Sequence, residues 1–449
     1  MTVDTTLVFR GTPQAESARR AHEASLSPPA APRVVDANWL RDLCLEVGAS
    51  DAGFVELSRP GLGAEAEHAR RLFPRTKSLV CLVGISNRDA LRSVSRAAAN
   101  VAWHYAGDRL DHAAAALCEC LAQSGVGGVP TTIGFPMDMH ATEGGSIWEI
   151  AHKIVAVEAG MGHMGVNRNV IHPRFGNYIL LNTVLIDAEV DRYDTPLDYN
   201  PCLGCNLCVA ACPVGAIHAN GEFDFFACMG HNYREFLFGF TDWVDTIASE
   251  GGTEGYRAKF RESETLSMWQ SLAFEPNYKS AYCMAVCPAG DDVIGPYLAD
   301  RAQYRHEVLT PFLRKSEPIY VQSGTRAEKV ASRKSSKQVR YLDFKPDVST
   351  VANFSVGLRH MFRPTPEPEV GCTVAFRFPD GQLTATLDDG KLATVEHFDA
   401  DAEAIVICDE PDYIRILYRP VPGRPDPPPL RYAVTGKREA LELLLSQLG

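Results

Sequence analysis

CLGCNLCVAACP (residues 202–213) contains four cysteines separated by two, two and three residues, with a proline directly after the last. Two-residue gaps turn the backbone so that three sulfurs can reach one iron–sulfur cube. We therefore expect one 4Fe-4S cluster on Cys202, Cys205 and Cys208. In two-cluster ferredoxins the fourth cysteine ligates the other cluster, which assigns Cys212 to a second site. The alternative is zinc, whose ligands usually come in pairs without the trailing proline.

A second motif, AYCMAVCPAG (281–290), repeats the pairing of a cysteine with a following proline. By this pairing Cys287 is expected to complete the first cluster. Cys283 and the isolated Cys228 are then expected to join the fourth cysteine of the first run on the second cluster. Ser280 stands where a further thiolate is expected, so the second cluster is predicted to be either a 3Fe-4S form or a 4Fe-4S form with a non-cysteine ligand.

The composition limits the kind of protein. The chain has 449 residues, 45% of them hydrophobic and 22% charged, and a net charge of −12. These values favour a soluble protein of two or three domains. Acidic chains bind nucleic acid poorly, because neutralising phosphates requires clustered Lys and Arg. We find no apolar run long enough to span a membrane and no export signal, so we expect free thiols in the cytoplasm.

The first part of the chain alternates helical and strand patterns. Amphipathic or Ala-rich stretches predict helices at 36–49, 109–125 and 146–160. Continuous short apolar runs at 78–85 and 178–187 predict strands that are buried on both faces. These elements predict a layered α/β core.

The last part of the chain has a different pattern. Residues 372–398 alternate apolar and polar side chains around two turn signals, which predicts a β-meander followed by a strand at 404–409. Helices are expected at 354–362 and 437–448. The domain boundaries that we expect are 1–33 for a tail or strap, 34–195 for a cofactor domain, 196–300 for an iron–sulfur module with a helical insert, 301–344 for a linker, and 345–449 for a C-terminal α/β (α+β) domain.

Several motifs resemble those of two reductase families. FPRTKSLVCLVGI (73–85), AWHYAGDRLDH (102–112) and EAGMGHMGVNRNVIHPRFGNYILLNTVLID (158–187) precede the cysteine motifs, in the order seen in epoxyqueuosine reductases and reductive dehalogenases. The resemblance covers roughly residues 34–300. It implies a nitroreductase-like domain that binds a corrinoid (cobalamin), beside a ferredoxin-like module with two clusters.

The resemblance also indicates a corrinoid site. AGMGHMG (159–165) places Gly160, Gly162, His163 and Gly165 after a helix, and in the resembling families this region lines the corrinoid. Glycines allow the backbone to approach a large flat ligand closely. The same glycines could instead form only a tight helix-to-strand turn, and the sequence leaves both interpretations open.

Reduction at cobalt needs a proton donor. Glu143 falls where epoxyqueuosine reductases have a catalytic aspartate, and Tyr105 is the alternative because reductive dehalogenases use a tyrosine. Further candidates are His104, His140 and His163.

Residues 345–449 resemble a sterol-carrier-protein type-2 domain, which implies an apolar tunnel; the alternative is a structural or dimerisation domain. We therefore predict a cytoplasmic iron–sulfur and corrinoid reductase of an apolar small molecule, for example by reductive dehalogenation. Its electron donor is expected to be a ferredoxin or flavodoxin, and it can form a homodimer. The alternatives are an electron-transfer protein without catalysis of its own and an epoxyqueuosine-type reductase that modifies tRNA, although we expect no nucleic-acid partner.

Overall fold

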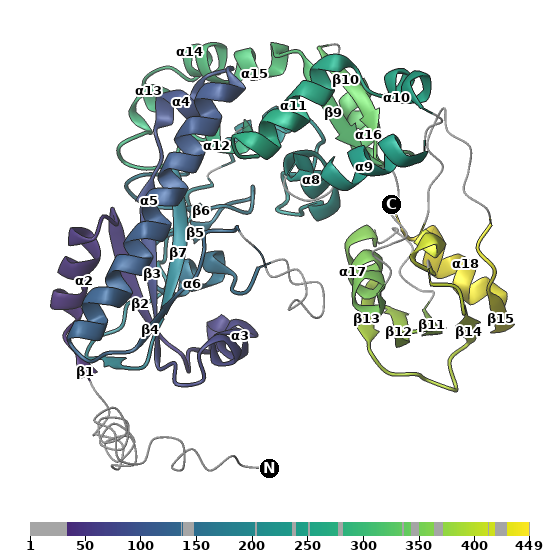
Figure 1. The fold of residues 1–449 in the computed structure, drawn as a ribbon, viewed down its shortest axis with the longest axis horizontal. Coiled ribbons are helices and arrows are strands. Elements are labelled where there is room, and N and C mark those ends of the chain that lie inside the picture. Colours follow the sequence, from purple (N-terminus) through teal and green to yellow (C-terminus); the bar gives the residue numbers. More distant parts are fainter. Residues whose placement is uncertain are drawn as a thin grey trace, which may run out of the picture.

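The computed structural model describes residues 34–135, 137, 148–202, 204–235, 239–249, 252–276, 282–334, 336–342, 350–362, 371–411, 413–417 and 429–448. These residues form a mixed α/β protein (Figure 1). An N-terminal sheet with its helices is followed by a mainly helical middle part and a second, C-terminal sheet. Across the described ranges, no helix has both the length and the apolar character needed to cross a membrane.

The N-terminal sheet has the strand order β2-β3-β7-β4, and all its pairs are antiparallel. Its strands are β2 (Asp51–Glu56), β3 (Ser78–Ile85), β7 (Ile179–Ile186) and β4 (Gly128–Pro130). The two central strands β3 and β7 pair along their whole length, from Ser78 opposite Ile186 to Ile85 opposite Ile179. The two strands predicted from continuous apolar runs are thus confirmed, and they lie side by side.

Helices cover both faces of this sheet, namely α2 (Ala37–Glu46), α5 (Arg96–Gln123), α3 (Glu65–Leu72) and α6 (His152–Glu158). Val80 and Leu82 of β3 share a core with residues of α2 and α5. The alternate residues Leu79, Cys81 and Val83 share a second core with residues of α3 and α6. Because successive side chains of a strand point to opposite faces, burial on both faces explains the unbroken apolar run.

The helix boundaries show where local signals were sufficient. Asp36 caps α2 by accepting a hydrogen bond from the Trp39 backbone at 2.7 Å, as its sequence predicts. α5 begins at Arg96 after a Ser95 cap, which is earlier than predicted. α6 begins only at His152, and Glu149 lies in a bend before it, so the helix predicted from residue 146 is too long.

The middle part contains short helices around the cysteine motifs: α7 (Leu207–Ala211), α8 (Phe225–Asn232), α9 (Gly239–Ser249), α10 (Thr253–Lys259), α11 (Glu262–Ala273) and α12 (Tyr282–Ala285). The helical insert predicted between Cys228 and Cys283 is therefore confirmed. The insert lies between α8, which contains Cys228, and α12, which contains Cys283.

After α13 (Gly295–Ala299), the stretch expected as a linker (301–344) forms regular elements instead: α14 (Arg301–Tyr304), a π-helical turn (Arg305–Leu309), α15 (Thr310–Arg314), β9 (Glu317–Val321), α16 (Arg326–Ser332) and β10 (Lys337–Tyr341). β9 and β10 pair in parallel. Ile319 and Ala331 belong to the same hydrophobic core as Leu207 and Cys208. The many basic residues of this stretch suggested an exposed linker, so its buried positions were not predicted from the sequence.

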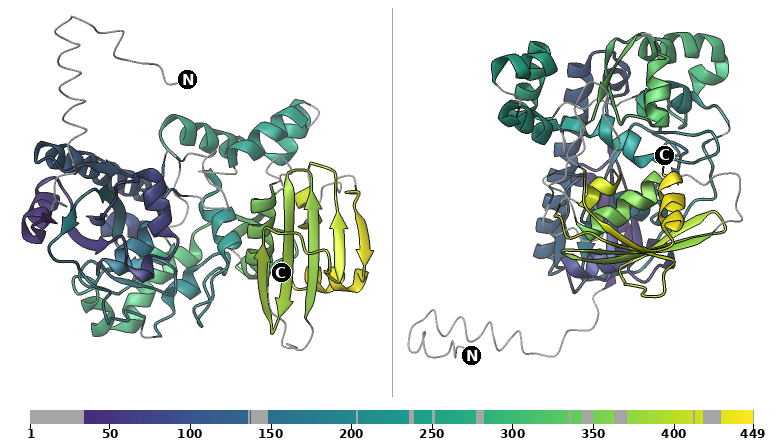
Figure 2. Two further views of the ribbon diagram at one scale, coloured as in Figure 1. Left: turned by 90° about the horizontal axis from the view of Figure 1, so that it is seen from below. Right: turned by 90° about the vertical axis from the view of Figure 1, so that its right-hand side faces the viewer.

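The C-terminal sheet has the order β13-β12-β11-β14-β15, and Figure 2 shows it apart from the N-terminal sheet. Its elements are α17 (Val351–Met361), β11 (Cys372–Phe378), β12 (Gly381–Asp388), β13 (Lys391–Val395), β14 (Ala404–Ile407), β15 (Ala433–Gly436) and α18 (Arg438–Ser446). The predicted meander is confirmed. Phe226 of α8 packs against the C-terminal core, so this domain contacts the iron–sulfur module.

Candidate iron–sulfur and cofactor site

The structure brings together the four cysteines expected on the first cluster. Cys202 and Cys205 lie in the loop before α7, where Gly204 (φ +74°) and Asn206 (φ +53°) turn the backbone in the left-handed region. Cys287 packs in a small core that Cys202 also contacts. Burial raises the pKa of Cys287 to about 12, and thiolates at Cys205 and Cys202 raise it further, which shows how close these sulfurs are.

Cys208 lies close to the other three cysteines of this group. Burial is the largest cause of the raised pKa of Cys208, and thiolates at Cys283, Cys287, Cys205 and Cys202 add to it. A cationic iron–sulfur cluster would offset this mutual repulsion between thiolates.

The three cysteines expected on the second cluster also lie together. Burial raises the pKa of Cys228, and thiolates at Cys212 and Cys283 raise it further. The pKa of Cys283 is raised to about 11, again first by burial and then by Cys212. A thiolate at Cys283 raises the pKa of Cys208 in the first group as well as that of Cys228 in the second, so the two groups are neighbours. Ser280, at the missing fourth position, lies outside the described residues.

The environment of these sulfurs suits clusters, because N–H groups directed at sulfur tune and stabilise iron–sulfur centres. Three sulfurs accept such bonds: Cys202 from the backbone of Val166 at 3.5 Å, Cys212 from the backbone of Ala216 at 3.2 Å, and Cys283 from the side chain of Asn169 at 3.8 Å. Among the residues that the structure describes, no three His, Cys, Asp or Glu side chains are placed to hold a single metal ion. A cube of irons separates its thiolates more widely than one ion does.

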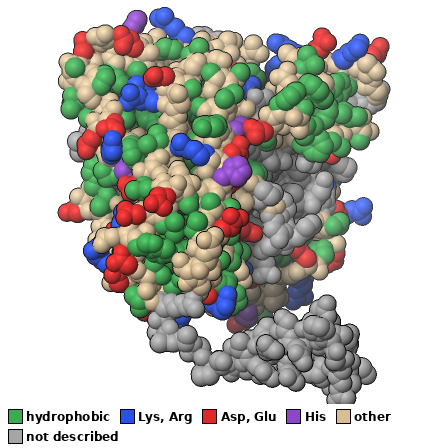
Figure 3. All heavy atoms as spheres, turned by 60° about the vertical axis from the view of Figure 1, so that its left-hand side comes forward, with side chains coloured by type: hydrophobic (Ala, Val, Ile, Leu, Met, Phe, Trp, Pro, Cys, Tyr) green, Lys and Arg blue, Asp and Glu red, His purple; other side chains and the backbone are tan. Residues whose placement is uncertain are grey.

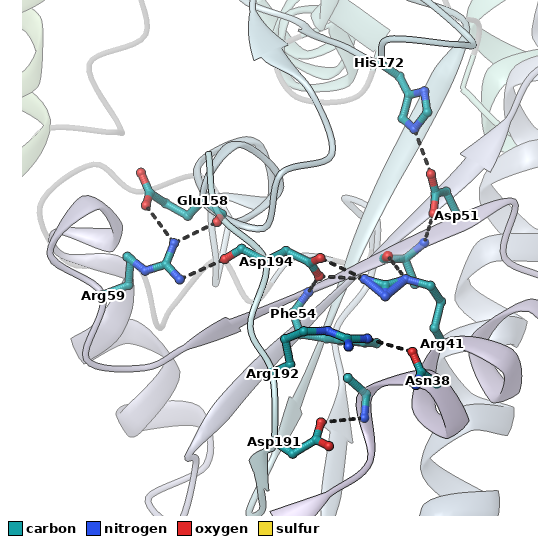
Figure 4. A network of polar contacts seen from close by, with 12 residues as sticks. Asn38, Arg41, Asp51, Phe54, Arg59, Glu158, His172, Asp191, Arg192 and Asp194 are labelled. Atoms are coloured by element: carbon teal, nitrogen blue, oxygen red, sulfur yellow. Dashed lines mark hydrogen bonds and ion pairs between the residues drawn. The ribbon is translucent and has the colours of Figure 1, made fainter. Parts of the chain in front are cut away.

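A polar network fixes the chain just before Cys202 (Figure 4). The Asp194 carboxylate accepts two hydrogen bonds from the Arg41 guanidinium, at 2.7 and 2.9 Å, and one from the Phe54 backbone at 2.8 Å. Arg59 donates to the Asp194 carbonyl at 2.9 Å and to the Glu158 carbonyl at 3.1 Å. The strand β2, helix α2 and the end of α6 thus hold the segment that delivers the first cluster ligand.

The glycines of the 159–165 loop face protein. A Cβ on Gly160 (φ +69°) would lie 2.7 Å from the Thr195 carbonyl oxygen. A Cβ on Gly162 would lie 2.5 Å from the Ile171 carbonyl oxygen, and one on Gly165 would lie 2.6 Å from the Ile171 side chain. These contacts favour the interpretation of a tight turn that packs against its own chain. His163 Nδ1 is 3.0 Å from the Met164 carbonyl oxygen.

Two residues beside the second cysteine group were missed by sequence reasoning. The Lys153 side chain is accessible to solvent, yet surrounding protein lowers its pKa while thiolates at Cys228 and Cys283 oppose that shift. Burial raises the pKa of Tyr233, which the same two thiolates also raise. The Tyr233 ring meets Trp148 edge-on at 5.8 Å. A lysine on an amphipathic helix resembles a solvated residue in sequence, so nothing marked it in advance.

Three of the five predicted proton donors, namely Tyr105, His104 and His163, lie within the described residues. Glu143 and His140 lie outside the described residues. Tyr105 is 68% exposed on α5. Its neighbour His104 is 2.9 Å from the Pro276 carbonyl oxygen and 3.3 Å from the Glu275 carboxylate, so His104 fastens the end of the helical insert to α5.

Comparisons with known proteins agree with the cysteine motif. The 4Fe-4S binding domain family matches residues 195–218, which include the four cysteines of the 202–213 motif. Epoxyqueuosine reductase of Bacillus cereus is 32% identical over 81 residues, which is 18% of this chain and 21% of that protein. The enzyme of the same name from Staphylococcus aureus is 32% identical over 80 residues, covering 18% and 20%. The similar segment thus spans about a fifth of the length of these curated relatives.

Solved structures give weaker similarities. Epoxyqueuosine reductase from Streptococcus thermophilus aligns with a TM-score of 0.34 and 14% identity, over 61% of this chain and 75% of that one. A catabolic reductive dehalogenase in complex with 3-bromo-4-hydroxybenzoic acid aligns with a TM-score of 0.33 and 17% identity, over 54% and 37%. The chain therefore contains a 4Fe-4S binding domain and a segment related to epoxyqueuosine reductases.

Proposed function

We propose that this chain is an iron–sulfur reductase of the epoxyqueuosine reductase type, in which two clusters pass electrons to a bound corrinoid. The observation that supports it most is the grouping of seven cysteines into two neighbouring sets. A thiolate at Cys283 raises the pKa of Cys208 in the first set and of Cys228 in the second. The matching 4Fe-4S domain and the related 81-residue segment agree with it.

Each set has a part in this proposal. Cys202 and Cys205 are only partly buried and flank the exposed Gly204, so the first cluster is the point at which a ferredoxin or flavodoxin delivers electrons. Lys153 and Tyr233 lie beside Cys228 and Cys283 of the second cluster, and we place the cofactor on their side. A corrinoid, when bound, supplies a cobalt centre that accepts these electrons and reduces the substrate.

This chain's own residues would position and protonate the reactants. Lys153 Nζ donates to the Arg168 carbonyl at 2.8 Å and to Asn169 Oδ1 at 3.2 Å, so its proton-bearing atom is held in place. Lys153 Nζ and the Tyr233 hydroxyl are the candidates for proton transfer, and Glu143 stays a further candidate from sequence. The edge-on contact of the Trp148 and Tyr233 rings, at 5.8 Å, holds the Tyr233 side chain in place.

Two substrate classes are supported by different observations. The names of the relatives favour an epoxyqueuosine in tRNA, which is our first candidate. The net charge of −12 opposes it, and Lys and Arg are interspersed with Asp and Glu on the face in Figure 3. The second candidate is therefore an apolar small molecule. Exposed apolar side chains support it, among them Val101, Tyr105, Trp269 and Phe274.

One anaerobic experiment tests the proposal and separates the substrates. Purified protein is reconstituted with iron, sulfide and cobalamin, its iron and cobalt are counted, and it is reduced with dithionite. Conversion of an epoxyqueuosine-containing tRNA stem loop supports the first candidate, and dehalogenation of a bromophenol supports the second. Two clusters without any cobalamin binding would leave electron transfer as the function and would contradict the reductase proposal.

For residues 350–448 we propose a sterol-carrier-like module that binds an apolar ligand. Its interior holds closely packed rings, since Phe378 stacks on Tyr413 at 3.8 Å and Phe354 meets both Phe376 and Phe378 edge-on. Displacement of a fluorescent fatty acid from the full chain tests this proposal, and the absence of saturable binding would reject it.

A further inference from the structure

One half-buried arginine and two buried tyrosines form a unit beside the backbone of Cys287. Arg92 ends the short helix α4 (Arg88–Arg92). Its Nε donates to the Tyr178 hydroxyl at 2.9 Å, and its Nη2 donates to the Tyr304 hydroxyl at 2.8 Å. The guanidinium carbon also lies over both rings, 5.3 Å from the Tyr178 centroid and 5.4 Å from the Tyr304 centroid. The two tyrosines are 2% and 3% exposed, whereas Arg92 is half-buried.

This unit binds three successive carbonyl groups at the end of α12. Tyr178 donates to the carbonyl of Ala285 at 2.7 Å and approaches that of Cys287 at 3.3 Å. Arg92 donates to the Ala285 carbonyl at 3.3 Å, and Tyr304 donates to the Val286 carbonyl at 3.4 Å. The last carbonyls of a helix have no partners within the helix, so this unit satisfies groups that would otherwise be buried without a hydrogen bond.

Arg92 reaches the first cysteine group through Tyr178. Its Nε donates to the Tyr178 hydroxyl at 2.9 Å, and that hydroxyl lies 3.3 Å from the Cys287 carbonyl oxygen. Burial is the largest cause of the raised pKa of Tyr304; Arg92 lowers this pKa, and thiolates at Cys287 and Cys205 raise it further. The pKa of Tyr178 is likewise influenced by Arg92 and by Cys287. A positive charge near a cluster favours its reduced, more negative form.

We propose that Arg92 is a positioning residue that fixes the peptide of Cys287 and raises the reduction potential of the first cluster relative to the second. This inference rests on the two-cluster assignment above. Arg92 thereby makes the first cluster easier to reduce by an external donor, which fits its place at the electron inlet. Tyr178 and Tyr304 orient the guanidinium and the carbonyl groups through their hydrogen bonds.

The test is an EPR-monitored redox titration of both clusters in the reconstituted full chain. In Arg92→Gln we expect the ratio of reduced to oxidised first cluster, at the native midpoint, to fall about tenfold, equivalent to about 59 mV for one electron. The second cluster should keep its potential. Arg192→Gln is the matched control, because Arg192 binds Asn38 at 2.7 Å on the surface of the N-terminal domain and the change removes the same charge.

The variants also separate charge from geometry. Tyr304→Phe keeps the charge and should change the ratio much less than Arg92→Gln. If Arg92→Gln does not assemble its first cluster, Arg92→Lys decides: assembly with a near-native potential supports the proposal, and a shift as large as that of charge removal overturns it. An unchanged potential in Arg92→Gln, or equal shifts of both clusters, also overturns it. Failure of the wild type to bind two clusters would instead reject the proposed function.

Discussion

The side-chain amide of Asn169 donates a hydrogen bond to the Sγ of Cys283 at 3.8 Å, and its Oδ1 accepts one from Lys153 Nζ at 3.2 Å. Asn169 therefore joins Cys283, the ligand that we propose for the second cluster, to Lys153. Neither contact follows from the sequence, where the two residues stand far from Cys283.

Asn169→Leu should lower the reduction potential of the second cluster, because an N–H···S bond stabilises the more negative reduced state. The first cluster should be unaffected. EPR-monitored titration measures both potentials, and Asn200→Leu, which removes a bond to the backbone of Cys202 (2.9 Å), is the comparison at the first cluster. A shift of the first potential alone in Asn169→Leu would contradict the assignment.

Cysteine substitutions should remove iron in two independent portions. Cys287→Ala is expected to lose the first cluster and Cys228→Ala the second, each with about half of the iron. Cys81→Ala is the control, because this fully buried thiol lies in the N-terminal sheet. Iron and sulfide analysis after anaerobic reconstitution measures the loss. Equal loss of all iron in both variants would show that the two sites assemble as one.

His152 should make the fold less stable in mild acid. Burial lowers its pKa from 6.5 to about 4, and the ring lies 2.7 Å from the Thr132 carbonyl oxygen and 2.9 Å from the Thr183 hydroxyl. Because the unfolded chain binds this proton below pH 6.5 and the folded chain does not, stability is lost as the pH falls from 6.5 toward 4, by up to about 3 kcal/mol.

Urea unfolding between pH 7 and 4.5 measures this effect. The wild type should lose more stability over this range than His152→Gln. The extra slope of its unfolding free energy against pH should correspond to about one proton taken up on unfolding. Parallel stability profiles for the two proteins would show that His152 titrates normally in the folded state.

Asp194→Asn should destabilise the protein by about 1–2 kcal/mol, because it weakens a charge-assisted pair with Arg41 that is only about one-third exposed. Glu67→Gln removes the exposed pair with Arg70 at 3.5 Å and should change stability by less than about 0.5 kcal/mol. Chemical unfolding monitored by circular dichroism gives both values. A larger effect at Glu67 than at Asp194 would contradict the network shown in Figure 4.

Gly176→Ala should disturb the loop that follows Cys287. A Cβ at Gly176 would overlap the Ala289 carbonyl oxygen, in addition to the strain of a positive φ of 64°. Gly63→Ala is the matched control, since its φ is 54° and no atom lies within 4 Å of the added Cβ. The control should cost only about 1–2 kcal/mol of strain, whereas Gly176→Ala should cost more and should also lower first-cluster occupancy. Equal losses would show that the Ala289 contact is unimportant.

The sequence by itself determined the elements whose signals are local. The strand at 78–85 reads as buried because every residue except the last is packed between helix layers, and the cysteine spacing follows from the geometry of a cluster. The meander was also predictable, because its alternation and its turn residues are adjacent in sequence. The beginning of α6 was not, since residues 149–151 could form helix but are held otherwise by tertiary contacts such as Ala151 with Glu65 at 2.7 Å.

Only the tertiary structure decided which distant groups surround the clusters. Arg92 and Tyr178 meet Ala285 across more than a hundred residues, and Lys153 reaches the neighbourhood of Cys283. It also showed that the glycines of the 159–165 loop pack against the chain, which their sequence left open. The physical reason is that a motif specifies its own ligands through short-range backbone geometry, whereas burial and charge at those ligands are set by segments that fold against them.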